Sequence, residues 1–278
     1  MAKGIGLIGN FRGKVGNMVG YNLKDSNNKQ TQGVRVYQPV VKNPKTAGQA
    51  EQRAKLAPIN ATYRALKSII DRGQEGKAYG NKSRLAWLSD AMKAFNGAWF
   101  PKGEAINYAA LVTLTKGSLA NPFTVDASAS TVSIGFATAA SAAPTTIGAL
   151  ATQLIGDFPS LKAGDQITLV EVSNIDTDMN VYFDSIVLDT QSTDAIPGSF
   201  TVNTSGITLK GSDGNANSGA IIISREGDNG QHLRSTSNMV AMENYWSEGT
   251  EAAAKAAAIK SYMSAGANTD WAEESLQD

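Results

Sequence analysis

The hydrophobic pattern of this 278-residue chain changes near residue 108, and that change limits what the chain can fold into. Before it, apolar residues recur at the spacing of the buried face of an amphipathic helix. After it, short runs rich in Thr, Val, Ile and Ser alternate with turn residues, as in an antiparallel sandwich or barrel. The pattern predicts an α+β protein: a basic N-terminal arm and helices, an antiparallel β-sandwich-like domain, and a C-terminal helix. The expected parts are residues 1–107, 108–242 and 243–278.

The first part begins with a glycine-rich arm and continues into a helix. Residues 33–38 have the composition of a strand, and residues 18–21 are expected to pair with it. A helix is expected to begin after Thr46, because its hydroxyl can accept an unpaired backbone N–H, and Gln49 allows a capping box. Pro58 is expected to kink or split this helix, since proline removes one helical hydrogen bond.

Two further helices are expected. One spans about residues 81–95, and its apolar face consists of Leu85, Leu88, Met92 and Phe95. Aromatic residues near this helix could stack on nucleic-acid bases, although aromatic residues at helical spacing more often belong to a core. The other spans about residues 247–265, is rich in alanine, and carries a narrow apolar edge suited to docking on another surface: Ile259, Tyr262 and Met263.

The strands of the β-rich part are expected at residues 131–136, 166–172, 180–188, 198–202, 206–210 and 220–224. The last two flank a loop rich in Gly, Ser, Asp and Asn, which favours a hairpin between them. Residues 137–153 are rich in Ala, Ser and Thr and are expected to form a surface loop.

The net charge of zero conceals a division along the chain. Residues 1–100 hold 17 Lys/Arg and 5 Asp/Glu, a net charge of +12, whereas residues 101–278 hold 8 and 20, a net charge of −12. Such asymmetry indicates contact with nucleic acid or another charged partner. Alternatively, the two halves neutralise each other, within one chain or between neighbouring subunits.

The composition excludes several chemistries. The chain has no cysteine, which rules out disulfides, zinc–thiolate sites and thiol catalysis, and its one histidine, His232, excludes sites built on several histidines. No nucleophile–base motif or phosphate-binding loop of the Walker type is present. We therefore expect no catalytic residues, no metal and no cofactor. No targeting segment or membrane-spanning run is evident, so the protein is expected to be made in a cytoplasm and to have no membrane partner.

Short motifs in the first part resemble those of a known family: Gly13-Lys14-Val15-Gly16, then Arg35, then Lys42-Asn43-Pro44-Lys45-Thr46 with Gln49 and Arg53. The chain is similar here to an uncharacterised family from Bacteroidota and their phages. The similarity covers about residues 4–100 and, more weakly, Ser235-Thr236-Ser237. It implies a glycine-rich arm, a following helix, a β-rich half and a phage or phage-like origin, but no activity.

These observations favour a non-enzymatic structural protein, a phage virion component of head, connector or tail that assembles with itself or other virion proteins. One alternative is a nucleic-acid-binding protein that contacts phosphates through its basic N-terminal region. Another is a binding module of a bacterial cell surface. The residues expected to bind nucleic acid or an acidic partner are Lys14, Lys24, Arg35, Lys42, Lys45 and Arg53.

Overall fold

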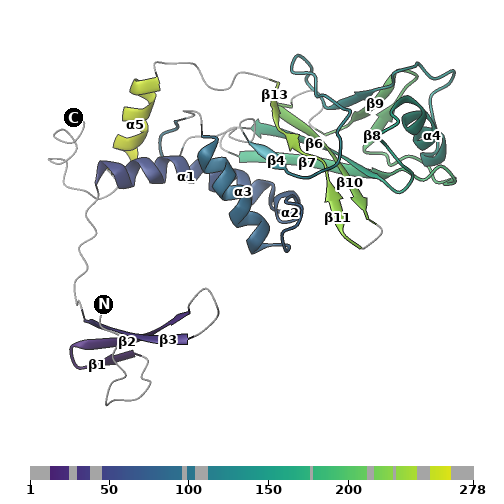
Figure 1. Cartoon of the computed structure of the whole chain (residues 1–278). Helices are drawn as coiled ribbons and strands as arrows, with labels where there is room; N and C mark the ends of the chain where they lie inside the picture. The colour runs from purple at the N-terminus through teal and green to yellow at the C-terminus, as the bar shows by residue number, and fades with distance from the viewer. Residues whose placement is uncertain are drawn as a thin grey trace. The chain divides into compact units, whose positions relative to one another are not determined.

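The computed structural model describes residues 13–24, 30–37, 46–95, 99–103, 112–175, 178–211, 216–227, 230–242 and 251–263. The chain divides into two compact units, Met1–Lys45 and Thr46–Asp278 (Figure 1). The three-part division expected from the sequence pattern, with boundaries after residues 107 and 242, stays a prediction.

The N-terminal unit is a three-stranded antiparallel sheet in the order β1 (Gly13–Val15), β2 (Met18–Lys24), β3 (Gln30–Val36). β2 pairs with β3 along its whole length, which confirms the expected pairing of these segments. The turn between β1 and β2 has only two residues. Its first residue, Gly16, has a φ of +58°, a conformation that favours glycine and matches the twist of a tight hairpin.

The second unit opens with three helices: α1 (Ala47–Ala65), α2 (Lys67–Ile70) and α3 (Asn81–Lys93). Thr46 caps α1, since its hydroxyl accepts a hydrogen bond from the Gln49 N–H at 3.3 Å. Of the two expected effects of Pro58, the split does not occur, and the kink stays a prediction. α1 runs through Pro58, whose ring is buried, so packing offsets the loss of one backbone hydrogen bond.

α3 presents most of the expected apolar face to the core, since Leu88, Met92 and Phe95 pack against the buried cluster that contains Trp87; Leu85 is the exception. Trp87 is 1% exposed and Ala91 is buried one turn further on, whereas Leu85 is 53% exposed. The Trp87 indole N–H donates to the Thr113 carbonyl at 3.1 Å, which fixes the rotation of the helix. The tryptophans near α3 therefore belong to the core, because Trp99 is also buried.

The β-rich part contains three antiparallel sheets. The largest has the order β11 (His232–Arg234), β10 (Ser218–Glu226), β6 (Gln166–Ile175), β7 (Asp178–Val187), with β13 (Val240–Ala241) also on β10. A three-stranded sheet has the order β5 (Ser133–Gly135), β9 (Gly206–Leu209), β8 (Phe200–Val202). A two-stranded sheet joins β12 (Ser237–Asn238) to β4 (Thr113–Thr115).

The largest sheet is covered on both faces. Alternate residues of β6 enter different cores: Leu169 packs towards the three-stranded sheet and α4 (Ile147–Asp157), whereas Val170 packs towards α1–α3. In β10, Ile221 packs in the first of these cores and Ile222 in the second. Both faces of the strand are buried, which explains its continuous apolar run. The second unit is thus layered as helices, sheet, and small sheet with α4 (Figure 1). The α+β class is confirmed.

Two local expectations are wrong. Residues 147–157 form α4 and not a loop, with Thr146 as the N-cap. The expected hairpin of residues 206–210 with 220–224 does not form, because β9 pairs with β5 and β8 while β10 lies in the largest sheet.

The C-terminal helix α5 (Glu251–Met263) docks on α1, as its apolar edge indicates. Ile259 and Met263 pack on Ala50, and Ala258 packs in a cluster with Trp99. A salt bridge of 3.4 Å between Lys255 and Glu51 of α1 borders this contact. Residues 247–250 and 264–265 of the expected helix lie outside the described residues.

Candidate functional site

The three-stranded sheet of the N-terminal unit has one basic face. Across β1, β2 and β3, the pairing places side by side Lys14, Val19 and Arg35, so their side chains share a face. Side chains alternate along a strand, so the residues two positions after Val19 and Arg35, Tyr21 and Tyr37, lie on the same face. The Lys14 ammonium is 3.7 Å from the centroid of the Tyr37 ring, and the Arg35 guanidinium carbon is 5.9 Å from that of Tyr21. We call Lys14, Tyr21, Arg35 and Tyr37 the basic face; its two cations each lie over an aromatic ring.

The other face of this sheet is apolar and open to solvent. Met18 lies opposite Val36, and Val34 lies opposite Gly20. The exposed fractions of Met18, Val34 and Val36 are 41%, 51% and 71%. Each hydrophobic cluster found among the described residues belongs to the second unit. We call Met18, Val34 and Val36 the apolar face; it is the kind of surface that marks a contact with another protein.

Of the six basic residues expected to bind a partner, the structure brings two together. Lys14 and Arg35 share the basic face. Lys24 ends β2 opposite Gln30, and its side chain lies outside the described ones. Lys42 and Lys45 lie outside the described residues. Arg53 is exposed on α1 and belongs to the second unit. Their role as binding residues stays a prediction.

The aromatic members of the basic face were not singled out from the sequence. Tyr21 and Tyr37 carry no motif, and their only signal is period-two alternation. Counting from Arg35 along β3 places Tyr37 on the same face, and the register of β2 against β3 places Tyr21 there as well. That register becomes known only with the structure.

The second unit is electrically divided between its helical and β-rich parts. Residues 46–103 hold 10 Lys/Arg and 4 Asp/Glu, whereas residues 104–278 hold 7 and 20. The ion pairs recorded for the described part of the chain leave these exposed cations of the helical part unpaired: Arg53, Arg64, Lys67, Arg72, Lys77, Lys82 and Lys93. The outer surface of the helical layer is therefore basic.

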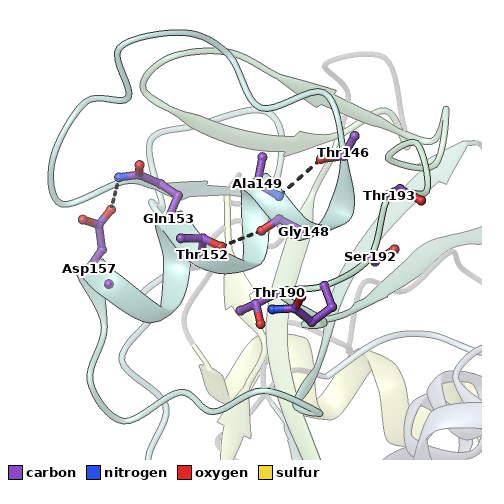
Figure 2. Close-up of a pocket in the computed structure, with 11 residues that line it drawn as sticks. Thr146, Gly148, Ala149, Thr152, Gln153, Asp157, Thr190, Ser192 and Thr193 are labelled. Carbon is purple, nitrogen blue, oxygen red and sulfur yellow. Dashed lines mark hydrogen bonds between the residues drawn. The ribbon is translucent and has the colours of Figure 1, made fainter.

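A polar pocket of about 730 Å³ lies beside α4, at the end of the unit away from α1–α3 (Figures 1 and 2). It is formed by one side of the helix and the loop at residues 190–193. The Thr152 hydroxyl donates to the Gly148 carbonyl at 2.8 Å, and the Gln153 amide donates to the Asp157 carboxylate at 3.0 Å. These polar groups stabilise α4 itself and do not define a ligand.

Two kinds of site are absent from the described ranges of the chain. Those ranges contain no cluster of three or more His, Asp or Glu side chains placed to hold a metal ion. They also contain no helix long and apolar enough to cross a membrane. The expectations of no catalytic residue, metal or cofactor stay predictions.

The fold and its surfaces define the class: an α+β protein in which a small basic sheet and basic helices precede a β-rich region. Within that class, the chain belongs to a family of unknown function, DUF6266, whose model matches residues 10–154, more than half of the chain. No curated protein and no solved structure matches it. The match confirms the expected membership of an uncharacterised family; the phage and Bacteroidota origin stays a prediction.

Proposed function

We propose that this chain is a non-enzymatic structural and assembly protein, a phage virion component of head, connector or tail that acts through protein–protein contacts. The proposal includes a homo-oligomer, or an assembly with other virion proteins, formed after synthesis in the host cytoplasm. The phage origin comes from the resemblance of the N-terminal motifs, and the contact surface comes from the structure.

The observation that carries the proposal is the apolar face of the N-terminal unit. A three-stranded sheet is stable when a hydrophobic face is packed against something. Here Met18, Val34 and Val36 are exposed, and the unit contributes no described residue to a hydrophobic cluster. A partner that covers this face would bury apolar surface, and each Å² buried would stabilise the contact by roughly 25 cal/mol. The sheet thus has the properties of an arm that inserts into a neighbouring subunit.

The division of charge supports the same proposal. The N-terminal unit has 8 Lys/Arg and 1 Asp/Glu, and the second unit has 17 and 24, so the units carry net charges of +7 and −7. Opposite charges orient two subunits head to tail. Such a contact repeats from copy to copy and builds a ring or an open array.

The test is the mass of the full chain in solution, measured at about 50 and 500 mM salt, where charged contacts are screened to different extents. We expect oligomers in the wild type and weaker association in Val34→Thr/Val36→Thr, which keeps the β-branched shape but makes the face polar. Val187→Thr is the matched control, because Val187 is a strand residue of similar exposure, 50%, in the second unit.

A wild type that is monomeric in both salts, and that mass spectrometry does not find in purified phage particles, would overturn the proposal. If the paired variant and the control weaken association equally, the apolar face is not the contact surface.

A second candidate function is nucleic-acid binding, favoured by the basic face. Lys14 and Arg35 lie with Tyr21 and Tyr37 on one side of the sheet, a combination that suits contact with phosphates and bases. The test is a titration of the full chain with labelled DNA. Binding that weakens steeply with salt supports this function, and no binding at low salt removes it.

A further inference from the structure

A second group of cations and aromatic rings lies within the second unit, on β11 and on the chain segment between α2 and α3. Arg72 follows α2, Tyr79 precedes α3, and His232 and Arg234 lie two positions apart on β11. The Arg72 guanidinium carbon is 5.7 Å from the Tyr79 ring centroid, and the rings of Tyr79 and His232 are 5.8 Å apart at 31°. The Arg234 Nε–H donates to the Arg72 carbonyl at 2.6 Å. We call these four residues, together with Lys77 of the chain segment that runs from Arg72 to Tyr79, the Tyr79 patch.

The patch is accessible. Tyr79 is 54% exposed, Arg72, Lys77 and His232 are exposed, and Arg234 is half-buried. Because Arg72 and His232 both contact the Tyr79 ring and Arg234 donates to the Arg72 carbonyl, the patch gathers two guanidinium groups and an imidazole on a small area. An anion that reached it would therefore meet donors that are already arranged.

Its positive charge is only partly balanced. The Glu75 carboxylate is occupied by hydrogen bonds from Ser118 and from the Arg234 backbone N–H, and Glu226 lies opposite His232 on β10. Burial lowers the pKa of Arg234; Tyr79 and Glu75 act to raise it, while the neighbouring charge of Arg72 lowers it further. Two guanidinium groups thus disfavour each other's charge, and a bound anion would relieve this repulsion.

The helical layer carries further cations outside the patch. Arg84 lies 4.7 Å from the centroid of the Tyr63 ring, a second arginine held on a tyrosine. The neighbouring Arg64, Lys67 and Lys82 are exposed and belong to no ion pair recorded in the described part of the chain. Several separate exposed cations suit a ligand whose charges repeat at short intervals. Duplex nucleic acid is such a ligand, with one phosphate charge for about every 1.7 Å of its axis.

We propose that the Tyr79 patch and the adjacent cations of α2 and α3 bind the phosphate backbone of duplex nucleic acid. Arginine suits this role because its planar fork pairs with two phosphate oxygens at once. This contact depends on the charge and shape of the duplex and has no sequence preference. This site is separate from the basic face of the N-terminal unit, and it does not depend on self-assembly.

The first experiment measures binding of the full chain to a labelled duplex over a range of salt concentrations. Arg72→Gln/Lys77→Gln removes two exposed cations of the patch, and we expect about tenfold weaker binding and a salt slope smaller by about 2. Lys162→Gln/Lys210→Gln makes the same change in net charge on exposed loops of the β-rich part and should leave the slope unchanged. Lys14→Gln/Arg35→Gln tests the N-terminal basic face separately. Unfolding midpoints check that all variants fold.

Equal losses in the patch variant and in the charge-matched control would overturn the proposal, because net charge alone would then explain the binding. A loss confined to Lys14→Gln/Arg35→Gln would also overturn it. Absence of binding by the wild type at low salt would have the same consequence.

The second experiment uses His232 as a probe, since it is the only histidine of the chain and gives a single imidazole Hε1 resonance. Unlabelled duplex should shift this resonance in the wild type and shift it less in Arg72→Gln/Lys77→Gln. Polyglutamate serves as the acidic-protein comparison. If polyglutamate shifts the His232 resonance and the duplex does not, the ligand of the patch is an acidic protein, and the proposal is overturned.

Discussion

At the scale of single residues, Glu75 joins three segments of the second unit. One carboxylate oxygen accepts from the backbone N–H groups of Ser118 and Arg234, both at 2.9 Å, and the other accepts from the Ser118 hydroxyl at 2.7 Å. Burial acts to raise the pKa of Glu75, but these hydrogen bonds outweigh it and lower the pKa below its ordinary 4.5. A lowered pKa in the folded state means that the ionised carboxylate stabilises the fold.

This interaction predicts a pH dependence with a definite sign. The contribution of Glu75 is complete above about pH 5 and is lost as the pH falls through the lowered pKa of the folded state. The unfolding free energy of Glu75→Gln should therefore lie below that of the wild type at pH 7, and the gap should narrow towards pH 3. Urea unfolding at a series of pH values measures this difference in unfolding free energy. Asp194→Asn, on an exposed loop, is the control, and a gap for Glu75→Gln that stays constant with pH would contradict the prediction.

At the scale of elements, the sequence identified most strands and helices and the pairing of β2 with β3, but not the strand neighbours within the β-rich part. The strands at residues 166–172 and 180–188 were predictable, because runs of β-branched residues between turn residues strongly favour strands. The helix at residues 147–157 was missed, since its Ala- and Thr-rich start resembles a loop. The buried face of α3 was predicted except for Leu85, which is exposed, while Trp87 takes the central buried position because its indole N–H bonds to β4.

The close packing between the layers gives a prediction for β10. A Cβ at Gly219 would lie 2.1 Å from a Val132 methyl carbon and 2.9 Å from the Met242 methyl group, whereas a Cβ at Gly156 of α4 would meet nothing within 4 Å. Gly219→Ala should lower the unfolding free energy by about 1–3 kcal/mol, because the core is already filled. Gly156→Ala should raise it by up to about 1 kcal/mol through helix propensity. Denaturant unfolding of both variants compares them, and equal effects would contradict the packing argument.

At the scale of the whole molecule, the charge division is the feature that the sequence showed best. Its basic part includes both the separate N-terminal sheet and the helical layer of the second unit. Lys14 and Arg35 could be proposed from the sequence, because both lie in short motifs of the arm. The Tyr79 patch could not, because Arg72 and Arg234 are 162 positions apart and only the packing of β11 beside the α2–α3 loop joins them.

The two-unit organisation predicts that folding and association can be separated. Each hydrophobic cluster found among the described residues lies after residue 45, and α5 packs on α1 within the second unit. Deleting residues 1–45 should therefore leave the thermal unfolding midpoint of the remainder nearly unchanged. The same deletion removes the apolar face and a net charge of +7, so the salt-sensitive association of the full chain should be lost. Calorimetry and solution mass measure the two effects on one sample. A large fall in the midpoint would show that the N-terminal sheet completes the core of its own chain, and its apolar face would then not be available to a neighbour.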